Sequence, residues 1–390
     1  MCGKAMKQFL TELPKCEHHI HIEGSLSPAL LFELAKTNNI TLPDSATDAS
    51  FESPEALESR YERFTSLNDF LHYYYIGMSV LIKAADYESL AYEYLTKANR
   101  DGVHHAEIFF DPQAHTERGI AYNTVVEGLS AGLKRAEKDF GITSKLILCF
   151  LRHLSAEDAN TTYQEAVSLG HFSNGTVAAI GLDSSEVGFP PEIFREVYES
   201  AEAKGIHRTA HAGEEGDPSY ISRALDICKV ERIDHGIRLA EDENFNVRLR
   251  CVENVGQLPI RKFLDAGIKF SINSDDPAYF GGYILDNYVA VQEAFCLNLK
   301  EWQYIATSAI EGSWCDDERK AVLLGKVEEC FFRSFGFRVL KISGTSGTKG
   351  VLLSIEKYFP ISMLEFTAWA LRFELLWLLE NQELYRQPPR

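Results

Sequence analysis

The sequence lacks the features that mark secreted, membrane-spanning or disulfide-rich proteins. Its first fifteen residues, "MCGKAMKQFLTELPK", contain no continuous apolar run of the kind that a signal peptide carries. Its eight cysteines include no Cys-x-x-Cys pair, so reduced thiols and a cytoplasmic location are expected, with the nucleus as a second compartment. The apolar stretch 359–380 is interrupted by charged residues, which favours a packed helix over a membrane span.

Basic residues are also too few for some classes of partner. There are 39 lysines and arginines against 57 acidic residues, and the net charge is −18. Such a surface repels the phosphates of nucleic acids and the headgroups of anionic lipids. We therefore expect no nucleic-acid partner and no membrane partner.

What the sequence does contain is an alternation of short apolar runs and helix-like segments. The apolar runs fall at 16–23, 104–112, 145–152, 176–184, 207–215, 232–238 and 269–277. Apolar strands that alternate with helices are typical of a parallel sheet covered by helices. Seven strands are one short of a closed eightfold barrel, and the long helix-like block before residue 100 predicts a helical insertion after the first strand.

The segment "CEHHIHIEG" at 16–24 crowds three histidines into four positions. In an extended strand, side chains alternate between two faces, so His19 and His21 point one way and His18 points the other way. Two imidazoles on one face can share a metal ion. The alternative is a strand whose polar residues lie on a solvated face.

Each of the predicted strands carries polar or ionisable residues at its C-terminal end. They are His19, His21 and Glu23; Asp111; Arg152; Asp183; His211 and Glu214; His235; and Asp275 and Asp276. Singly, each could be a helix cap or a salt-bridge partner. Parallel α/β folds build their sites at this rim, so the shared placement favours a site.

These residues can be combined into a hydrolytic zinc site. His19, His21, His211 and Asp275 form a set of three nitrogens and one oxygen, and zinc lowers the pKa of a bound water to roughly 7. His235 could take the proton of that water, and Asp275 could help to orient it. Glu214 could act as an acid toward the substrate if its pKa is raised. Such a set hydrolyses an amide-like or amidine-like group.

Four segments, "CEHHIHIEGS", "HAGEE", "RIDHGIRLAED" and "INSDDPAYFGGY", resemble the signature segments of the adenosine/adenine deaminase family, and the likeness extends over residues 10–330. The resemblance implies a metal-dependent (β/α)8 barrel with one zinc ion on His19, His21, His211 and Asp275. It also implies that Glu214 gives a proton to a purine ring nitrogen, that His235 lies beside the attacking water, and that Asp276 bonds the purine, at N7.

The details of two segments are closer to the fungal-type adenine deaminase branch than to the enzymes that act on adenosine. Glu23, followed by Gly24, stands where the nucleoside enzymes carry a shorter aspartate, and Ser185 and Glu186 stand where they carry small residues. We expect these four residues to bind the substrate, filling the volume of the ribose and bonding the N9–H or N3 edge of adenine.

Two regions depart from the family pattern. His211 and His235 are 24 positions apart for one strand–helix–strand step, so two steps need about 48, yet only 40 positions separate His235 from Asp275. One strand, the seventh, and its preceding helix therefore look deleted near residues 245–246, although the alternation of Val247, Leu249 and Cys251 offers a substitute strand. Residues 1–335 are expected to form the barrel, and 336–390 a tail without a match.

The leading interpretation is a hydrolase that converts adenine and water to hypoxanthine and ammonia in purine salvage. Adenosine as the substrate is one alternative. A relative or splice product that keeps the ligands without closing the barrel is another. No feature of the sequence indicates an oligomeric state.

Overall fold

The computed structural model describes residues 3–240, 254–334, 337–343 and 349–355. The chain divides into two compact units, Met1–Val327 and Glu328–Arg390. The predicted gap near 245–246, the substitute strand at Val247–Cys251 and the helix predicted within 359–380 all lie outside the described residues.

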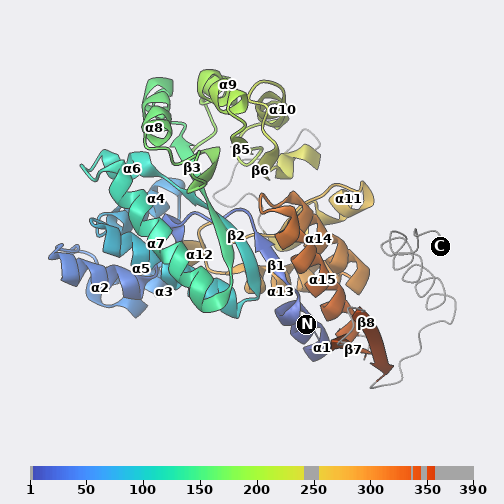
Figure 1. Ribbon diagram of the computed structural model, residues 1–390. Helices are drawn as coiled ribbons and strands as arrows, with labels where there is room; N and C mark the ends of the chain where they lie inside the picture. The colour runs from blue at the N-terminus through green and yellow to red at the C-terminus, as the bar shows by residue number, and fades with distance from the viewer. Residues whose placement is uncertain (1–2, 241–253, 335–336, 344–348, 356–390) are drawn as a thin grey trace. The chain divides into compact units, whose positions relative to one another are not determined.

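The first unit contains a six-stranded parallel sheet in the order β1-β2-β3-β4-β5-β6 (Figure 1). The strands are β1 Lys15–Glu17, β2 Val103–Phe110, β3 Thr143–Leu151, β4 Val177–Asp183, β5 His207–Ala212 and β6 Arg232–His235. The sheet is curled, and the predicted α/β class with parallel strands in chain order is confirmed. Inside the sheet, Phe109, Ile147, Cys149 and Ala179 form a buried cluster against which Trp314 packs.

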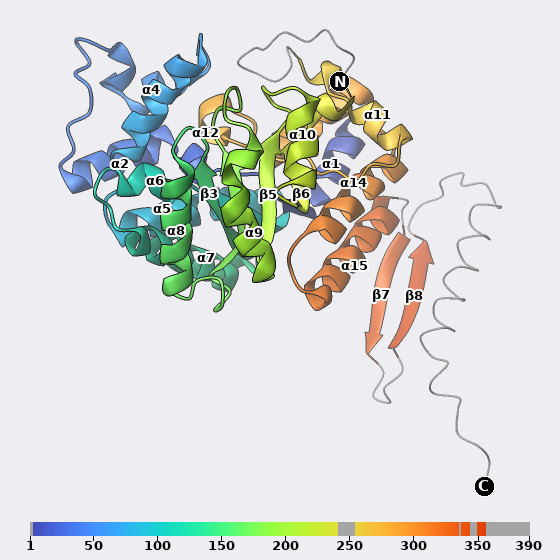
Figure 2. The same cartoon turned by 90° about the horizontal axis from the view of Figure 1, so that it is seen from above.

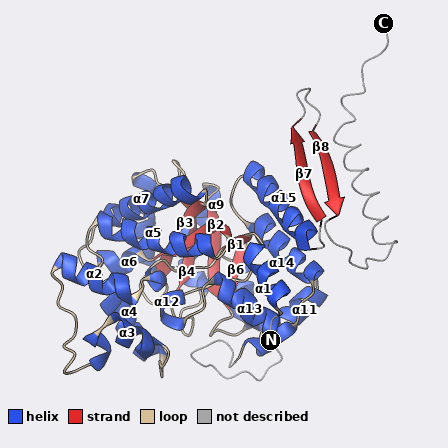
Figure 3. Cartoon of the chain, turned by 90° about the horizontal axis from the view of Figure 1, so that it is seen from below, coloured by secondary structure: helices blue, strands red, loops and turns tan. Residues whose placement is uncertain are grey.

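Helices surround the strands, as the view coloured by secondary structure shows (Figure 3). They are α1 Lys4–Glu12, α2 Pro28–Asn38, α3 Pro54–Tyr61, α4 Leu67–Met78, α5 Ala84–Arg100, α6 Pro112–Thr116, α7 Tyr122–Phe140, α8 Ala156–Ser168, α9 Arg195–Ala203, α10 Pro218–Asp226, α11 Ile260–Asp265, α12 Pro277–Phe280, α13 Ile284–Phe295, α14 Leu299–Gly312 and α15 Asp317–Ser334. Short 3-10 helices lie at Glu23–Ser25, Ala49–Glu52, Pro191–Phe194, Ile237–Ala240 and Val255–Gln257. Both α9 and α10 contact β5 (Figure 2).

The helix predicted after Ser27 illustrates how local sequence sets these boundaries. The Ser27 hydroxyl accepts a hydrogen bond from the backbone N–H of Leu30, and Pro28 occupies the first turn, where its missing N–H costs nothing. At the other end, Asn39 adopts a left-handed conformation and closes the helix.

The first and last predicted strands are shorter than the sequence indicated. The first ladder ends at Glu17, and beyond it Ile20 and His21 form single bridges to Asp275 and Phe109. The prediction of a strand over 269–277 was wrong, because only Asp275 of this segment is bridged. The reason is that the backbone of the segment bonds only to His19 and His21, beyond the end of β1, and does not pair with β6, so no ladder extends along it in the described part of the chain.

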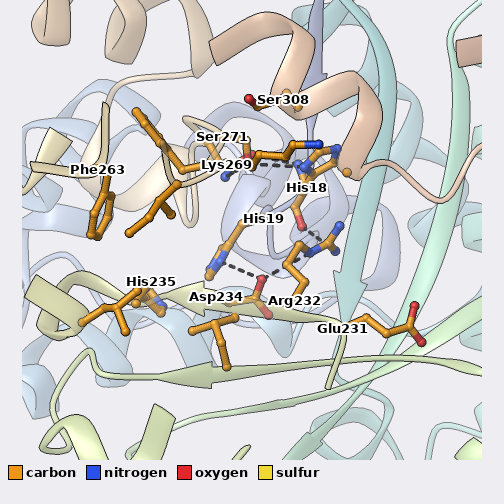
Figure 4. Close-up of a pocket in the computed structure, with 18 of the residues that line it drawn as sticks. His18, His19, Glu231, Arg232, Asp234, His235, Phe263, Lys269, Ser271 and Ser308 are labelled. Atoms are coloured by element: carbon orange, nitrogen blue, oxygen red, sulfur yellow. Dashed lines mark hydrogen bonds and ion pairs between the residues drawn. The ribbon is translucent and has the colours of Figure 1, made fainter. Parts of the chain in front are cut away.

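A cavity of about 560 Å³ lies between β6 and residues 268–275. Its walls include apolar side chains such as Leu225, Ile233 and Phe263, and polar ones such as Arg232 and Ser271 (Figure 4). Among the described residues, β6 has a hydrogen-bonded strand on one edge only, the edge that faces β5.

Two further observations concern the described residues as a whole. Their six cysteines are all free, as predicted. None of their helices combines the length and the apolar character that crossing a bilayer requires.

In the second unit, β7 Phe337–Ser343 and β8 Lys349–Ile355 form an antiparallel pair.

Candidate metal centre and active site

Three buried histidines and one aspartate converge at the C-terminal end of the sheet. The Nε2 atom of His211 lies 3.1 Å from that of His19 and 3.2 Å from that of His21. The Oδ1 atom of Asp275 lies 3.1 Å from Nε2 of His19 and 3.5 Å from Nε2 of His21. Zinc–nitrogen bonds of about 2.0–2.1 Å place tetrahedral ligands about 3.3–3.4 Å apart, and these four distances are close to that spacing.

Hydrogen bonds of the backbone hold this arrangement. The N–H of Asp275 donates to the carbonyl of His19 at 3.0 Å, and the N–H of His21 donates to the carbonyl of Asp275 at 3.1 Å. On the other side, the N–H of Phe109 donates to Ile20. His19 and His21 therefore share one face, as predicted, while His18 turns away and contacts the hydroxyls of Ser271 and Ser313.

The second nitrogen of each imidazole faces an acceptor. Nδ1 of His211 lies 2.8 Å from the carbonyl oxygen of Leu182. Nδ1 of His19 lies 3.7 Å from Asp234, and Nδ1 of His21 lies 3.6 Å from Asp183. Metal-binding histidines use such outer partners to fix the ring and leave Nε2 free for the ion.

The carboxylates make this point of the sheet favourable for positive charge. Burial lowers the pKa of His19, but Asp275 and Asp234 outweigh it and raise that pKa to about 10. Burial acts to raise the pKa of Asp275, yet the surrounding histidines hold it well below its usual range. Burial and the neighbouring imidazoles also lower the pKa of His211 well below its normal value, which keeps its ring neutral, as a metal ligand must be.

His235 and Glu214 lie together beside these ligands. Nε2 of His235 is 3.4 Å from Oε2 of Glu214, and both side chains are partly exposed. Burial raises the pKa of Glu214, and the charges of Asp275 and Glu186 add to that effect, while His235 opposes it. A carboxyl with a raised pKa retains its proton to higher pH, which favours a role as an acid.

The backbone is left-handed at two of these positions. His235 has φ 64° and Asp275 has φ 63°, a conformation that costs free energy in residues other than glycine. Both residues stand where an extended segment ends, and the left-handed turn directs each side chain toward the other site residues.

Three further predicted residues come together next to the ligands. Gly24 is in close contact with Asp276, because a side-chain carbon at Gly24 would lie 1.9 Å from Oδ1 of Asp276. Oε1 of Glu23 accepts hydrogen bonds from the N–H of Asp111 at 3.1 Å and from His115 at 2.9 Å. Oε2 of Glu23 and Oδ1 of Asp276 are buried and have no hydrogen-bond partner among the described residues, a cost that a bound substrate would relieve.

The other two predicted substrate residues have protein partners. The hydroxyl of Ser185 donates to Oε2 of Glu215 at 2.8 Å, and the N–H of Glu186 donates to the same oxygen at 3.0 Å. The carboxylate of Glu186 in turn accepts from the N–H groups of Glu215 and Gly216. Ser185 and Glu186 therefore bind the loop that follows Glu214.

Comparison with known proteins assigns this site to a family. The sequence matches the adenosine deaminase family model over two segments, residues 14–250 and 244–330. The chain belongs to the adenosine deaminase family. The adenine deaminase of Schizosaccharomyces pombe is 56% identical over 347 residues, which cover 85% of this chain and 94% of that protein.

Solved structures of family relatives support the same assignment. The crystal structure of an adenine deaminase from Arthrobacter aurescens is similar with a TM-score of 0.75 at 42% identity, covering 81% of this chain and 98% of that one. An amidohydrolase from Burkholderia ambifaria, solved with bound zinc, has a TM-score of 0.73 at 25% identity over 86% of this chain and 94% of its own.

Sequence reasoning missed one residue of the site, Asp234. Its carboxylate is buried, faces Nδ1 of His19, and accepts a hydrogen bond from the hydroxyl of Thr209 at 2.5 Å. Arg232, 3.7 Å away, also contacts the carbonyl of His18 (Figure 4). The strand period places Asp234 on one face with Arg232 and opposite His235, but its approach to His19 depends on how distant strands come together.

Proposed function

We propose that this protein is a zinc-dependent adenine deaminase, which converts adenine and water to hypoxanthine and ammonia. The observation that carries the proposal is the convergence of His19, His21, His211 and Asp275, with Glu214 and His235 beside them. The 56% identity to a fungal adenine deaminase over most of both chains supports adenine as the substrate.

The metal would be held by His19, His21, His211 and Asp275, as one zinc ion per chain. The distances among these ligand atoms support this set, as do the hydrogen bond of Nδ1 of His211 and the carboxylates that face Nδ1 of His19 and His21. Bound there, zinc would supply Lewis acidity and lower the pKa of a water molecule to roughly 7.

The chain's own residues direct the protons. Glu214, with its raised pKa, donates a proton to the ring nitrogen beside the carbon that is attacked, which makes that carbon more electrophilic. His235 receives the proton of the attacking water, and Asp275 orients that water. Positioned proton transfer of this kind contributes about 10²–10⁴-fold to the rate.

Asp276 binds the purine at N7. N7 is a hydrogen-bond acceptor, so the carboxyl of Asp276 must carry a proton to bond it. Burial and the adjacent charge of Asp275 raise the pKa of Asp276 well above its usual value, in agreement with that role. Gly24 leaves the space in which the Asp276 carboxyl lies.

Glu23 selects adenine over adenosine. Its buried and unpartnered Oε2 atom can accept a hydrogen bond from the N9–H of the free base. Adenosine has no N9–H and carries a ribose there, so it would leave that oxygen unpaired at a cost of about 1–3 kcal/mol and would also meet the longer side chain of glutamate.

A catalytically impaired relative is the second candidate, because of the cavity beside β6. We infer that the barrel lacks its seventh strand. Two observations support this inference: the cavity beside β6, and the overlap at residues 244–250 of the two segments that match the family model. We also propose that the helices between β1 and β2 are an insertion into the barrel. The deaminase domain then spans residues 1–335, and residues 336–390 form a separate tail. The proposed location of the protein is the cytoplasm.

The two candidates are separated by zinc content and ammonia release. Purified protein should contain one equivalent of zinc and release ammonia from adenine. Protein that binds zinc but releases no ammonia from adenine or adenosine would favour the impaired relative.

A further inference from the structure

A buried ion pair lies beneath the loop that carries Glu214. Arg152, directly after β3, and Glu186, shortly after β4, are both completely buried, and NH1 of Arg152 is 3.6 Å from Oε1 of Glu186. Burying two charges requires desolvation of both, so such a pair is weak evidence for stability by itself. Its contacts indicate what it does instead.

The arginine holds the strand end from which a metal ligand projects. NH1 of Arg152 donates to the carbonyl of His211 at 3.0 Å, and the backbone N–H of Arg152 donates to the carbonyl of Asp183 at 3.1 Å. Arg152 therefore connects the ends of β3, β4 and β5 at the level of the metal ligands.

The glutamate holds the residues that follow the proposed acid. One carboxylate oxygen of Glu186, Oε2, accepts from the N–H groups of Glu215, at 3.1 Å, and Gly216. In the opposite direction, the Ser185 hydroxyl and the Glu186 backbone N–H donate hydrogen bonds to the Glu215 carboxylate, so the two loops are bonded through both glutamates. Gly216 permits this approach, because a side-chain carbon there would lie 2.7 Å from Oε2 of Glu186.

We infer that Arg152, Ser185 and Glu186 form a clamp that fixes Glu214 relative to His211. Glu186 is then a positioning residue that acts through Glu214, in place of the substrate contact that the sequence predicted for it. The inference rests on the proposed function of Glu214 as proton donor. A displacement of about 1 Å at a reacting group can reduce the rate about a hundredfold. Contacts that hold the loop of Glu214 in place therefore preserve the rate.

The test compares Glu186→Ala and Glu186→Gln in the full-length, zinc-loaded protein. The alanine variant removes the acceptor of two N–H groups, and kcat for adenine should fall about ten- to a hundredfold while KM changes less than about threefold. The glutamine variant keeps an acceptor oxygen, so it should recover part of kcat. Glu192→Gln, which alters the half-exposed pair between Glu192 and Arg223, is the matched control and should change neither constant.

Hydrogen–deuterium exchange of residues 213–217 gives a second readout that needs no activity. The N–H groups of Glu215 and Gly216 should exchange faster in Glu186→Ala than in the parent. A rise in KM at constant kcat, with exchange unchanged, would overturn the clamp and return Glu186 to substrate binding. If the parent released no ammonia, the proposed function would fail, and the exchange of these N–H groups would still decide whether the clamp exists.

Discussion

The two flanks of the metal centre are built very differently. On the flank of β4 and β5, Arg152 and Glu186 bond the strand ends and loops together, and each strand pairs with a neighbour on both edges. On the flank of β6, the segment that supplies Asp275 is bonded to residues 19–21, which follow β1, by two backbone hydrogen bonds, and a cavity separates it from β6. The ligands nevertheless converge, because residues 19–22 are bonded to Phe109 on one side and to Asp275 on the other.

The largest expected effect comes from replacing His211, the metal ligand on the flank of β4 and β5. His211→Ala should lose most of its zinc and all detectable turnover, because His211 contacts both other imidazoles. Metal content by elemental measurement, together with ammonia release, checks this. His207→Ala, at the opposite end of the same strand, should keep the metal. Full zinc occupancy in the His211 variant would remove it from the ligand set.

Glu214→Gln should separate chemistry from metal binding. An amide cannot deliver the proton to the ring nitrogen, so kcat should fall about 10²–10⁴-fold, while zinc content stays at the parent value. Steady-state kinetics with adenine measure the loss. A variant that keeps more than about a tenth of the parent rate would exclude Glu214 as the acid.

Adding a strand on the flank of β6 is expected to have a moderate effect on stability and turnover. A strand and helix of the family pattern, inserted after Phe245, should pair with the edge of β6 that has no strand partner among the described residues and should fill the cavity. The melting temperature should rise by several degrees, because a few kcal/mol of added burial produces shifts of that size in a domain this large. Turnover should rise with it.

A glycine–serine insertion of equal length is the control for this experiment and should give no gain. If neither insertion raised the melting temperature or turnover, the segment "NVRLRCV" would already serve as the seventh strand.

The smallest effect concerns the pH dependence of the acid. The charge of Glu215 helps to raise the pKa of Glu214, and Glu214 must be protonated to act, so the rate should fall as pH rises through that pKa. Glu215→Gln removes the charge but keeps an acceptor oxygen. The alkaline limb of kcat should therefore move to lower pH. A limb that stays in place or moves to higher pH would contradict this electrostatic coupling.

The sequence was sufficient for the parts that depend on local pattern. The alternation in "HIHIE" placed His19 and His21 on one face, and apolar strands in chain order predicted the parallel sheet. It was insufficient where contacts join distant segments. The bonds of Ser185 and Glu186 to Glu215, and the approach of Asp234 to His19, depend on how strands curl together, which no local period encodes.

The central claim is that this metal centre deaminates free adenine, and parallel kinetics test it most directly. Ammonia release from adenine and from adenosine would be measured on the same zinc-loaded preparation. The expected result is a kcat/KM for adenine at least about a hundredfold higher, because the bond that we propose from N9–H to Oε2 of Glu23 can form only with the free base. A preference for adenosine would contradict the account.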